Sequence, residues 1–340
     1  MQAAIIRDKQ FWIEDIPTPQ PGPGQVLVKV LSCGICGSDI HLFNQGPDLV
    51  AKAAAAGAPI DDIGTDMVLG HEFVGEIVSF GPETTEALAV GDRVTSVPFL
   101  MKDGVVIPIG ASKATTGAYA QYLLLTEAAL VLVPESMSND AAALAEPLAI
   151  GVHAVAKANA VSTDAALVIG CGPIGLATVA ALRMRGVTQI IAADYSNRRR
   201  QLAEQMGASR VVNPAEENPY EALQSITATD NIIFECVGLK GLIHEIIVGA
   251  PQGSRVVIAG ICMEEDLFMP MLAVSKELCL QFVTYYTPEE FAESLQALAE
   301  ERFNWRPWIT GRVNLRGVSD AFEALKDPEQ HAKILIEPWS

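Results

Sequence analysis

The stretch Val168-Ile-Gly-Cys-Gly-Pro-Ile-Gly175 (VIGCGPIG) decides the fold class of this chain. It closes an apolar, strand-like run and opens a helical pattern, so its three glycines stand at a strand-to-helix turn. The spacing G-x-G-x-x-G is typical of a loop that binds a dinucleotide. Gly170 permits the tight turn, Gly172 lets the backbone approach a pyrophosphate, and Gly175 lets helix and strand pack closely. The alternative is a turn of an α/β protein that binds no nucleotide.

A carboxylate strengthens the dinucleotide interpretation. Asp194 ends the next apolar run, nineteen residues after Gly175, where it would bind ribose hydroxyls and repel a 2′-phosphate. The sequence therefore favours NAD over NADP. Arg198, Arg199 and Arg200 follow, and arginine can accommodate that phosphate, unless they only begin a solvated helix. We expect cofactor contacts from Gly170, Gly172, Pro173, Ile174, Gly175, Asp194, Arg199, Val237 and Gly260.

Strand and helix patterns alternate outward from the glycine loop. This alternation predicts a Rossmann domain, a doubly wound parallel sheet with crossover helices, over residues 151–299. Residues 1–150 instead show period-two alternation between turn residues, which predicts an irregular, mostly antiparallel β domain. The alanine-rich segment 48–64 predicts a short helix and a loop. The chain is therefore expected to be α/β with two domains.

Composition excludes several function classes. A chain of 340 residues suits two domains, and a net charge of −18 argues against nucleic acid or an anionic membrane as partner. The amino terminus has no signal-peptide pattern. The apolar segment around the glycine loop is interpreted as a buried βα unit and not as a membrane span. Six cysteines in a long chain without a signal predict reduced thiols and a cytoplasmic location.

The stretch CGICGSDIH (residues 33–41) has three possible interpretations: a redox dithiol, half of a structural zinc knuckle, or one wall of a catalytic metal site. No second C-x-x-C exists for a knuckle, and the motif lies in the β domain, away from a βαβ unit. Gly70-His71-Glu72 precedes another predicted strand. A thiolate, an imidazole and a carboxylate are the ligand types of a catalytic zinc with an open position.

These motifs together resemble the zinc-dependent medium-chain alcohol/polyol dehydrogenase superfamily over essentially the whole chain. The matching residues are GICGSDIH (34–41), GHE (70–72), GDRV (91–94), AEPLA (145–149), GCGPIG (170–175) and Asp194. The resemblance implies a GroES-like β-rich catalytic domain, made of residues 1–150 and completed by about 300–340, with the Rossmann domain inserted. The branch that contains sorbitol, threonine and glucose dehydrogenases is the most similar.

The resemblance also implies the zinc ligands. Cys36 and His71 match two of them, and the remaining protein ligand falls on Glu72 or Glu146. In this branch either glutamate can bind, sometimes exchanging with water. The family often carries a second, structural zinc on a four-cysteine lobe. Residues 96–121 contain no cysteine, so one catalytic zinc and no structural zinc are expected.

Further roles follow by position in the family. Ser38 matches the hydroxyl that receives the substrate proton, His41 matches the outer end of the proton relay, and Asp39 matches the carboxylate that orients the histidine ligand. Glu72 is the other candidate for a catalytic role. Cys33 matches no ligand position and is interpreted as a packed residue.

The expected function is hydride transfer between a secondary alcohol, polyol or sugar-type hydroxyl and NAD. Its alternatives are a zinc-free, NADPH-dependent reductase of activated double bonds and a non-catalytic NAD(H)-binding protein. The expected partner is a small alcohol or carbonyl compound. A homodimer or homotetramer is expected through the apolar run 278–284, interpreted as an edge strand. The segment 43–66 is longer than usual for the family.

Overall fold

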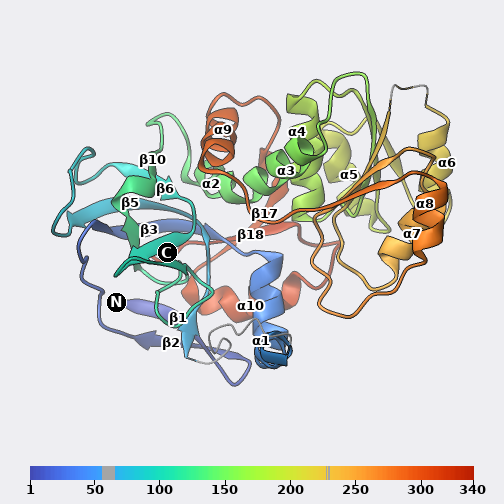
Figure 1. Ribbon diagram of the computed structural model, residues 1–340. Coiled ribbons are helices and arrows are strands. Elements are labelled where there is room, and N and C mark those ends of the chain that lie inside the picture. Colours follow the sequence, from blue (N-terminus) through green and yellow to red (C-terminus); the bar gives the residue numbers. More distant parts are fainter. Residues whose placement is uncertain (56–65, 227, 229) are drawn as a thin grey trace. The chain divides into compact units, whose positions relative to one another are not determined.

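Both ends of the chain contribute to one structural unit, and the middle of the chain forms another (Figure 1). The computed structural model describes residues 1–55, 66–226, 228 and 230–340. Unit 1 comprises Met1–Glu146, Ile309–Asp327 and Lys333–Ser340, and unit 2 comprises Pro147–Trp308 and Pro328–Ala332. The chain thus passes between the units at 146/147 and 308/309, and it returns briefly to unit 2 at 328–332.

Unit 1 is β-rich, and within its described residues the strands form three sheets. The largest has the order β10-β6-β5-β3-β18-β17, with β9 also pairing with β3; the others are β2-β1-β4 and the hairpin β7-β8. The strands are β1 (Gln2–Arg7), β2 (Gln10–Asp15), β3 (Gln25–Gly34), β4 (Met67–Val68), β5 (Glu72–Phe80), β6 (Arg93–Ser96), β7 (Phe99–Lys102), β8 (Val105–Pro108), β9 (Tyr122–Thr126), β10 (Leu130–Leu132), β17 (Ile309–Val313) and β18 (Lys333–Ile336). Apart from the parallel pair β17-β18, neighbouring strands are antiparallel, as the turn pattern predicted.

Strand β3 organises unit 1. Val26, Val28 and Val30 are fully buried in its core, which explains the alternating pattern read from the sequence. The same strand pairs with β5, β9 and β18. Strand β18 comes from the carboxyl end of the chain, and its Leu335 pairs with Gly34 at the end of β3. The last residues of the chain are therefore part of the sheet that carries the C-x-x-C stretch.

The longest described helix of unit 1 begins earlier than the sequence predicted. Helix α1 (Gly37–Ala55) starts directly after Cys36, and its first turn contains Asp39, an acidic residue suited to the positive end of a helix dipole. Residues 56–65 of the predicted helix and loop lie outside the described residues. Neither α1 nor any other helix in the described ranges is long and apolar enough to cross a membrane. The remaining helical elements of this unit are η1 (Glu127–Ala129), α2 (Asn139–Ala143), η3 (Leu315–Gly317) and α10 (Val318–Ala324).

Unit 2 contains the predicted Rossmann sheet. Within the described residues of this unit, six parallel strands have the order β13-β12-β11-β14-β15-β16. They are β11 (Ala165–Ile169), β12 (Gln189–Ala193), β13 (Arg210–Val212), β14 (Asn231–Glu235), β15 (Arg255–Ile258) and β16 (Cys279–Phe282). The chain winds outward from β11 in one direction and then returns to β14 on the other side of β11. In sheets of this kind, ligands bind at the carboxyl ends of the strands, where the winding direction reverses.

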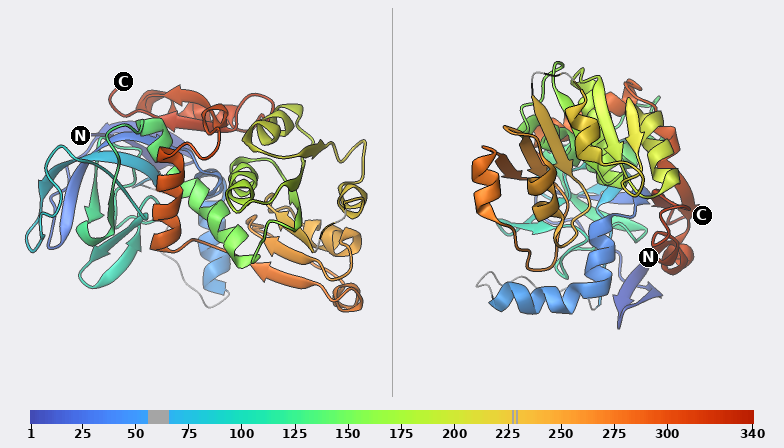
Figure 2. Two further views of the ribbon diagram at one scale, coloured as in Figure 1. Left: turned by 90° about the horizontal axis from the view of Figure 1, so that it is seen from above. Right: turned by 90° about the vertical axis from the view of Figure 1, so that its right-hand side faces the viewer.

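Both faces of this sheet are covered by helices, which can be followed in Figures 1 and 2. Leu167 and Ile169 pack with Leu223 and Ile246 on one face, whereas Val168 points to the other face toward the start of α4. This explains why the strand residues are almost all apolar. The helical elements are α3 (Ala145–Lys157, which begins in unit 1), α4 (Pro173–Met184), α5 (Asn197–Met206), α6 (Pro219–Gln224), α7 (Leu242–Gly249), α8 (Pro270–Ser275), α9 (Pro288–Ala299) and η2 (Arg306–Trp308).

Candidate metal centre and cofactor loop

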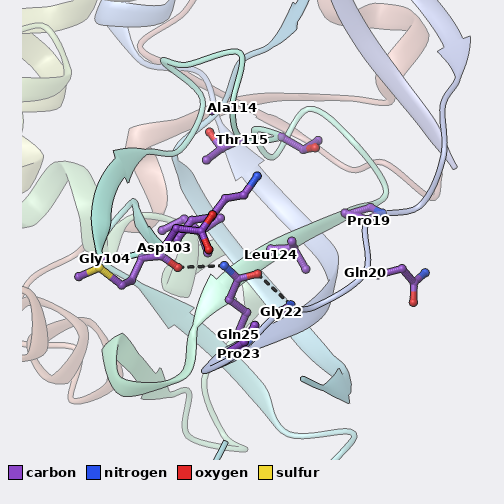
Figure 3. A pocket seen from close by; sticks show the side chains of 14 residues that line it. Pro19, Gln20, Gly22, Pro23, Gln25, Asp103, Gly104, Ala114, Thr115 and Leu124 are labelled. Atoms are coloured by element: carbon purple, nitrogen blue, oxygen red, sulfur yellow. Dashed lines mark hydrogen bonds between the residues drawn. The ribbon is translucent and has the colours of Figure 1, made fainter. Parts of the chain in front are cut away.

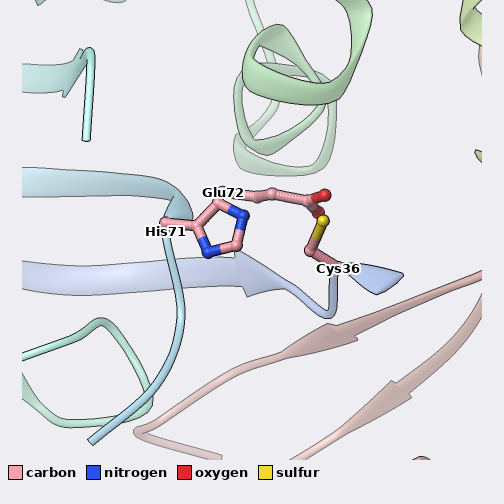
Figure 4. A group of neighbouring side chains, drawn as sticks. All are labelled: Cys36, His71 and Glu72. Carbon is pink, nitrogen blue, oxygen red and sulfur yellow. The ribbon is translucent and has the colours of Figure 1, made fainter. Parts of the chain in front are cut away.

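Three of the predicted zinc ligands converge where β3 ends and β5 begins. Gly34, the last residue of β3, pairs with Glu72, the first residue of β5. This pairing brings Cys36, His71 and Glu72 together, with their ligand atoms all within 4.8 Å of one another (Figure 4). A sulfur, an imidazole nitrogen and a carboxylate oxygen at this spacing suit a tetrahedral zinc. Within the described residues, this close group does not include Glu146.

Asp39 fixes the geometry around the two non-carboxylate ligands. Its side chain is fully buried, and Oδ2 accepts hydrogen bonds from the Cys36 amide (3.0 Å) and the Tyr119 hydroxyl (2.8 Å). Oδ1 lies 3.4 Å from Nδ1 of His71. Burial opposes the charge of Asp39, but His71, Cys36 and Tyr119 lower the pKa of Asp39 below its ordinary value. With Nδ1 facing Asp39, Nε2 of His71 is left for a metal, as in carboxylate–histidine–zinc triads.

Tyr119 is a site residue that sequence reasoning missed. It is fully buried, and its ring lies against Gly70, which has a φ of +101°. A Cβ at Gly70 would lie 2.5 Å from Cδ1 of Tyr119, so only glycine suits this position. This close approach explains the glycine of the Gly70-His71-Glu72 motif. No local pattern pointed to Tyr119, because it lies 80 residues from Asp39 in the sequence.

A buried ion pair holds the carboxylate of the close group. Nζ of Lys333 lies 2.6 Å from each carboxylate oxygen of Glu72 and donates to the carbonyl of Ile35 at 2.9 Å. Both charged side chains are fully buried. Burial alone would lower the pKa of Lys333, but Glu72, Cys36 and Glu146 raise it above its ordinary value. A Cβ at Gly34 would lie 2.0 Å from Oε2 of Glu72, so the glycine makes room for the carboxylate.

The other residues predicted for the centre come from the end of β3, the start of α1 and the start of α3. Glu146 is in the first turn of α3, is almost fully buried, and contributes to the raised pKa of Lys333. Ser38 is in the first turn of α1, and its Oγ lies 3.4 Å from Nε2 of His71. His41 follows in the same helix, half-buried, and burial lowers its pKa. Cys33 is fully buried, which raises its pKa well above the ordinary value and keeps it a thiol.

The glycine loop of unit 2 has the geometry that its sequence predicted. Gly170 has a φ of +87°, and a Cβ at Gly175 would lie 1.8 Å from the carbonyl oxygen of Gly170. Gly172 precedes α4, whose first position is Pro173. Proline suits that position because its missing N–H has no partner there in any helix. The turn therefore presents the amino end of α4, where backbone amides favour an anion such as a pyrophosphate.

Asp194 connects the glycine loop to the end of β12. Its Oδ2 accepts a hydrogen bond from the Cys171 amide and its Oδ1 from the Ser196 amide, both at 2.8 Å. Nη1 of Arg199 lies 4.0 Å from Oδ2 of Asp194 and the same distance from the position of a Cβ on Gly172. Arg199 is thus the arginine beside the loop.

A hairpin occupies the segment in which the family often has a structural-zinc lobe. Strands β7 and β8 pair with each other, and Gln25 connects their sheet to the loop before β3 (Figure 3). Nε2 of Gln25 donates to the Met101 carbonyl at 2.9 Å, and Oε1 accepts from the Gly22 amide at 3.0 Å. The pocket beside Gln25 has a volume of about 530 Å³ and contains none of the predicted site residues in its lining.

Comparison with known proteins agrees with this architecture. Residues 22–135 match the alcohol dehydrogenase GroES-like domain, and residues 173–300 match the zinc-binding dehydrogenase domain. The (R,R)-butanediol dehydrogenase of Bacillus subtilis is 30% identical over 351 residues, which cover 97% of each chain. The sorbitol dehydrogenase of the same organism is 27% identical over 99% of this chain and 97% of its own. The crystal structure of 2R,3R-butanediol dehydrogenase from Bacillus subtilis has a TM-score of 0.86 at 29% identity, and 99% of each chain is covered.

The chain belongs to the zinc-dependent medium-chain alcohol and polyol dehydrogenase superfamily. The family and fold class that the motifs predicted are confirmed. The protein is an oxidoreductase of the zinc type that acts on CH–OH groups with a nicotinamide cofactor. The two alternatives, a zinc-free reductase and a non-catalytic NAD(H)-binding protein, are not favoured by these relationships.

The buried pair of this dehydrogenase gives a stability prediction. Lys333→Met leaves the Glu72 carboxylate buried without its cation, so the free energy of unfolding should fall by about 3–5 kcal/mol. Urea unfolding of the variant measures this loss. The double variant Lys333→Met/Glu72→Gln removes both charges and should recover most of it. A single variant within about 1 kcal/mol of the original protein, the range of exposed pairs, would contradict the prediction.

Proposed function

We propose that this dehydrogenase oxidises a secondary alcohol, polyol or sugar-type hydroxyl with NAD at a single zinc site formed by Cys36, His71 and one glutamate. The observation that carries the proposal is the convergence of a thiol, an imidazole and a carboxylate within 4.8 Å. When bound, zinc supplies a Lewis acid that lowers the pKa of an alcohol, and NAD supplies the hydride acceptor. The remaining tasks fall to side chains of this chain.

Ser38 and His41 carry the proton in this proposal. Ser38 takes the proton of the substrate hydroxyl, and its contact with Nε2 of His71 at 3.4 Å puts it beside the metal ligands. His41 follows three residues later on the same helix, a spacing at which side chains are neighbours. Burial lowers the pKa of His41, so this imidazole is neutral near pH 7 and able to accept the proton. Asp39 keeps His71 oriented throughout.

Charge supports one glutamate as ligand at a time. The thiolate of Cys36 and one carboxylate neutralise a divalent ion, and the ammonium of Lys333 already neutralises Glu72. Lys333 already contacts both carboxylate oxygens of Glu72. We therefore assign the ligand role in the absence of substrate to Glu146, with Glu72 held close and able to exchange with it.

A single zinc per chain is proposed because residues 96–121 have no cysteine and contain the hairpin β7-β8.

NAD is the proposed cofactor because Asp194 stands beside the glycine loop. A carboxylate at this position accepts hydrogen bonds from ribose hydroxyls and repels a 2′-phosphate. Arg199 is close enough to Asp194 to be balanced by its charge, and Nη1 of Arg200 donates to the carbonyls of Asp194 and Tyr195 at 2.8 Å. These contacts leave the carboxylate as the group that selects the cofactor.

A panel of secondary alcohols, polyols and sugars, assayed for reduction of NAD and of NADP, tests both proposals. We expect turnover of at least one of these compounds with NAD, and a kcat/KM for NAD well above that for NADP.

Asp194→Gly should lower the ratio of kcat/KM for NAD to kcat/KM for NADP about tenfold or more, because one repelling charge is removed and Arg199 remains. Preference of the unmodified protein for NADP would contradict the role of Asp194, and the absence of any turnover would contradict the proposed substrates.

A homodimer is the proposed assembly, and pairs of dimers would give the alternative tetramer. Strand β16 is the edge of its sheet, and apolar side chains near it are exposed: Leu267, Met271, Val274 and Phe282. An open strand edge surrounded by apolar side chains favours pairing with another chain, and a second copy related by a two-fold axis would cover both the edge and the apolar surface.

Light scattering at micromolar concentration should give twice or four times the mass of the chain. A monomer mass would contradict the proposal.

We also propose a cytoplasmic location, because all six cysteines are free and thiols persist in reducing compartments.

A further inference from the structure

A buried carboxylate lies at the cofactor edge of the Rossmann sheet. Glu235 is the last residue of β14 and only 1% exposed. Its Oε1 accepts hydrogen bonds from the amides of Val237 (2.7 Å) and Gly238 (2.8 Å). Its backbone carbonyl accepts from the amides of Ala259 and Gly260, each at 2.9 Å. One residue therefore holds the loop after β14 with its side chain and the loop after β15 with its backbone.

The two loops touch each other through backbone atoms. A Cβ on Gly260 would lie 2.3 Å from the amide nitrogen of Gly238 and 2.4 Å from Oε2 of Glu235. A Cβ on Gly238 would lie 2.5 Å from the carbonyl oxygen of Ile261. Such contacts leave no space for a side chain, so the relative position of the loops depends on the hydrogen bonds that Glu235 accepts. Burial raises the pKa of Glu235, and the amides of Gly238, Val237 and Gly260 oppose that rise.

The same loops adjoin the glycine loop on the side away from Asp194. A Cβ on Gly170 would lie 2.5 Å from Cγ2 of Val237. In the strand order, β12 with Asp194 lies on one side of β11, and β14 and β15 lie on the other. A dinucleotide whose adenosine ribose binds at β12 and whose pyrophosphate binds at the start of α4 must extend its second nucleotide over β14 and β15.

We propose that Glu235 is a positioning residue for the nicotinamide half of the cofactor, because it fixes the loops after β14 and β15 on which that half rests. The inference depends on the proposed use of a nicotinamide cofactor. It distinguishes Glu235 from Asp194: both accept amides at the ends of parallel strands, but they serve opposite halves of the dinucleotide.

Two ligands isolate the nicotinamide ring experimentally. NADH contains the ring, whereas ADP-ribose keeps both riboses and both phosphates but lacks it. In Glu235→Gln a neutral amide replaces the carboxylate, so the hydrogen bonds from the Val237 and Gly238 amides lose the contribution of the charge and the loop after β14 should loosen. We expect the Kd for NADH, measured by its fluorescence, to rise about tenfold, the difference between a charged and a neutral hydrogen bond. The Kd for ADP-ribose, measured by calorimetry, should stay within about twofold.

A second variant and a matched control complete the test. The methyl group of Gly260→Ala would press on Gly238 in the loop after β14, so we expect the same selective loss of affinity for NADH. This variant keeps the inference testable if Glu235→Gln folds poorly. Asp164→Asn is the control. Asp164 is equally buried and accepts from the Val161 amide and from Arg255, but it lies before the amino end of β11. It should lower the melting temperature without changing the ratio of the two Kd values.

Equal weakening of NADH and ADP-ribose in both loop variants would overturn the inference, because it would show a general effect on the fold. An unchanged Kd for NADH in both variants would overturn it as well. Failure of the unmodified protein to bind either ligand would contradict the proposed function itself, a result that differs from equal weakening.

Discussion

The buried ion pair between Glu72 and Lys333 is the interaction on which unit 1 depends. Two charged side chains with no exposed surface are stable only when each neutralises the other and further hydrogen bonds are made. Lys333 meets this condition with both oxygens of Glu72 and the carbonyl of Ile35. Because Lys333 begins the last strand and Glu72 begins β5, the pair couples the carboxyl end of the chain to the residues beside Cys36 and His71. The candidate metal centre therefore depends on a contact between two distant parts of the chain.

Carboxylates also hold loops in place at the carboxyl ends of the strands of unit 2, but there they accept hydrogen bonds from backbone amides and not from a buried cation. Asp194 and Glu235 each stand at the end of a parallel strand and accept amide hydrogen bonds from a neighbouring loop. Carboxylates are strong acceptors for backbone amides, and buried amides need partners. Glycines at 170, 238 and 260 let the loops approach to backbone contact. Each loop at this edge is thus held by hydrogen bonds of its own, which suits the proposed binding of a dinucleotide there.

The parts of the fold that sequence could predict are those with a local signature. The alternation in 25–32, the glycine loop and Asp194 each follow from spacing alone, and the family resemblance added Cys36, His71 and the choice between Glu72 and Glu146. Lys333 and Tyr119 could not be predicted in this way, because their partners lie 261 and 80 residues away in the sequence. The lysine at the head of the apolar run KILIEP was the only available hint. The start of α1 at Gly37 was also missed, since its first turn is defined by Asp39 and not by helical periodicity.

We propose one zinc per chain, held by Cys36, His71 and one glutamate at a time. Zinc content measured by elemental analysis is the sharpest test of this proposal. Alanine at position 72 would leave the Lys333 ammonium without either carboxylate oxygen, whereas glutamine keeps one oxygen that can accept from it. We expect about one zinc per chain in the unmodified protein, as the three-ligand rule for catalytic sites requires. We expect the same zinc content in Glu72→Gln and in Glu146→Gln. We expect loss of zinc in the double variant Glu72→Gln/Glu146→Gln. Two tightly bound zinc ions per chain, or full zinc in the double variant, would contradict the proposal.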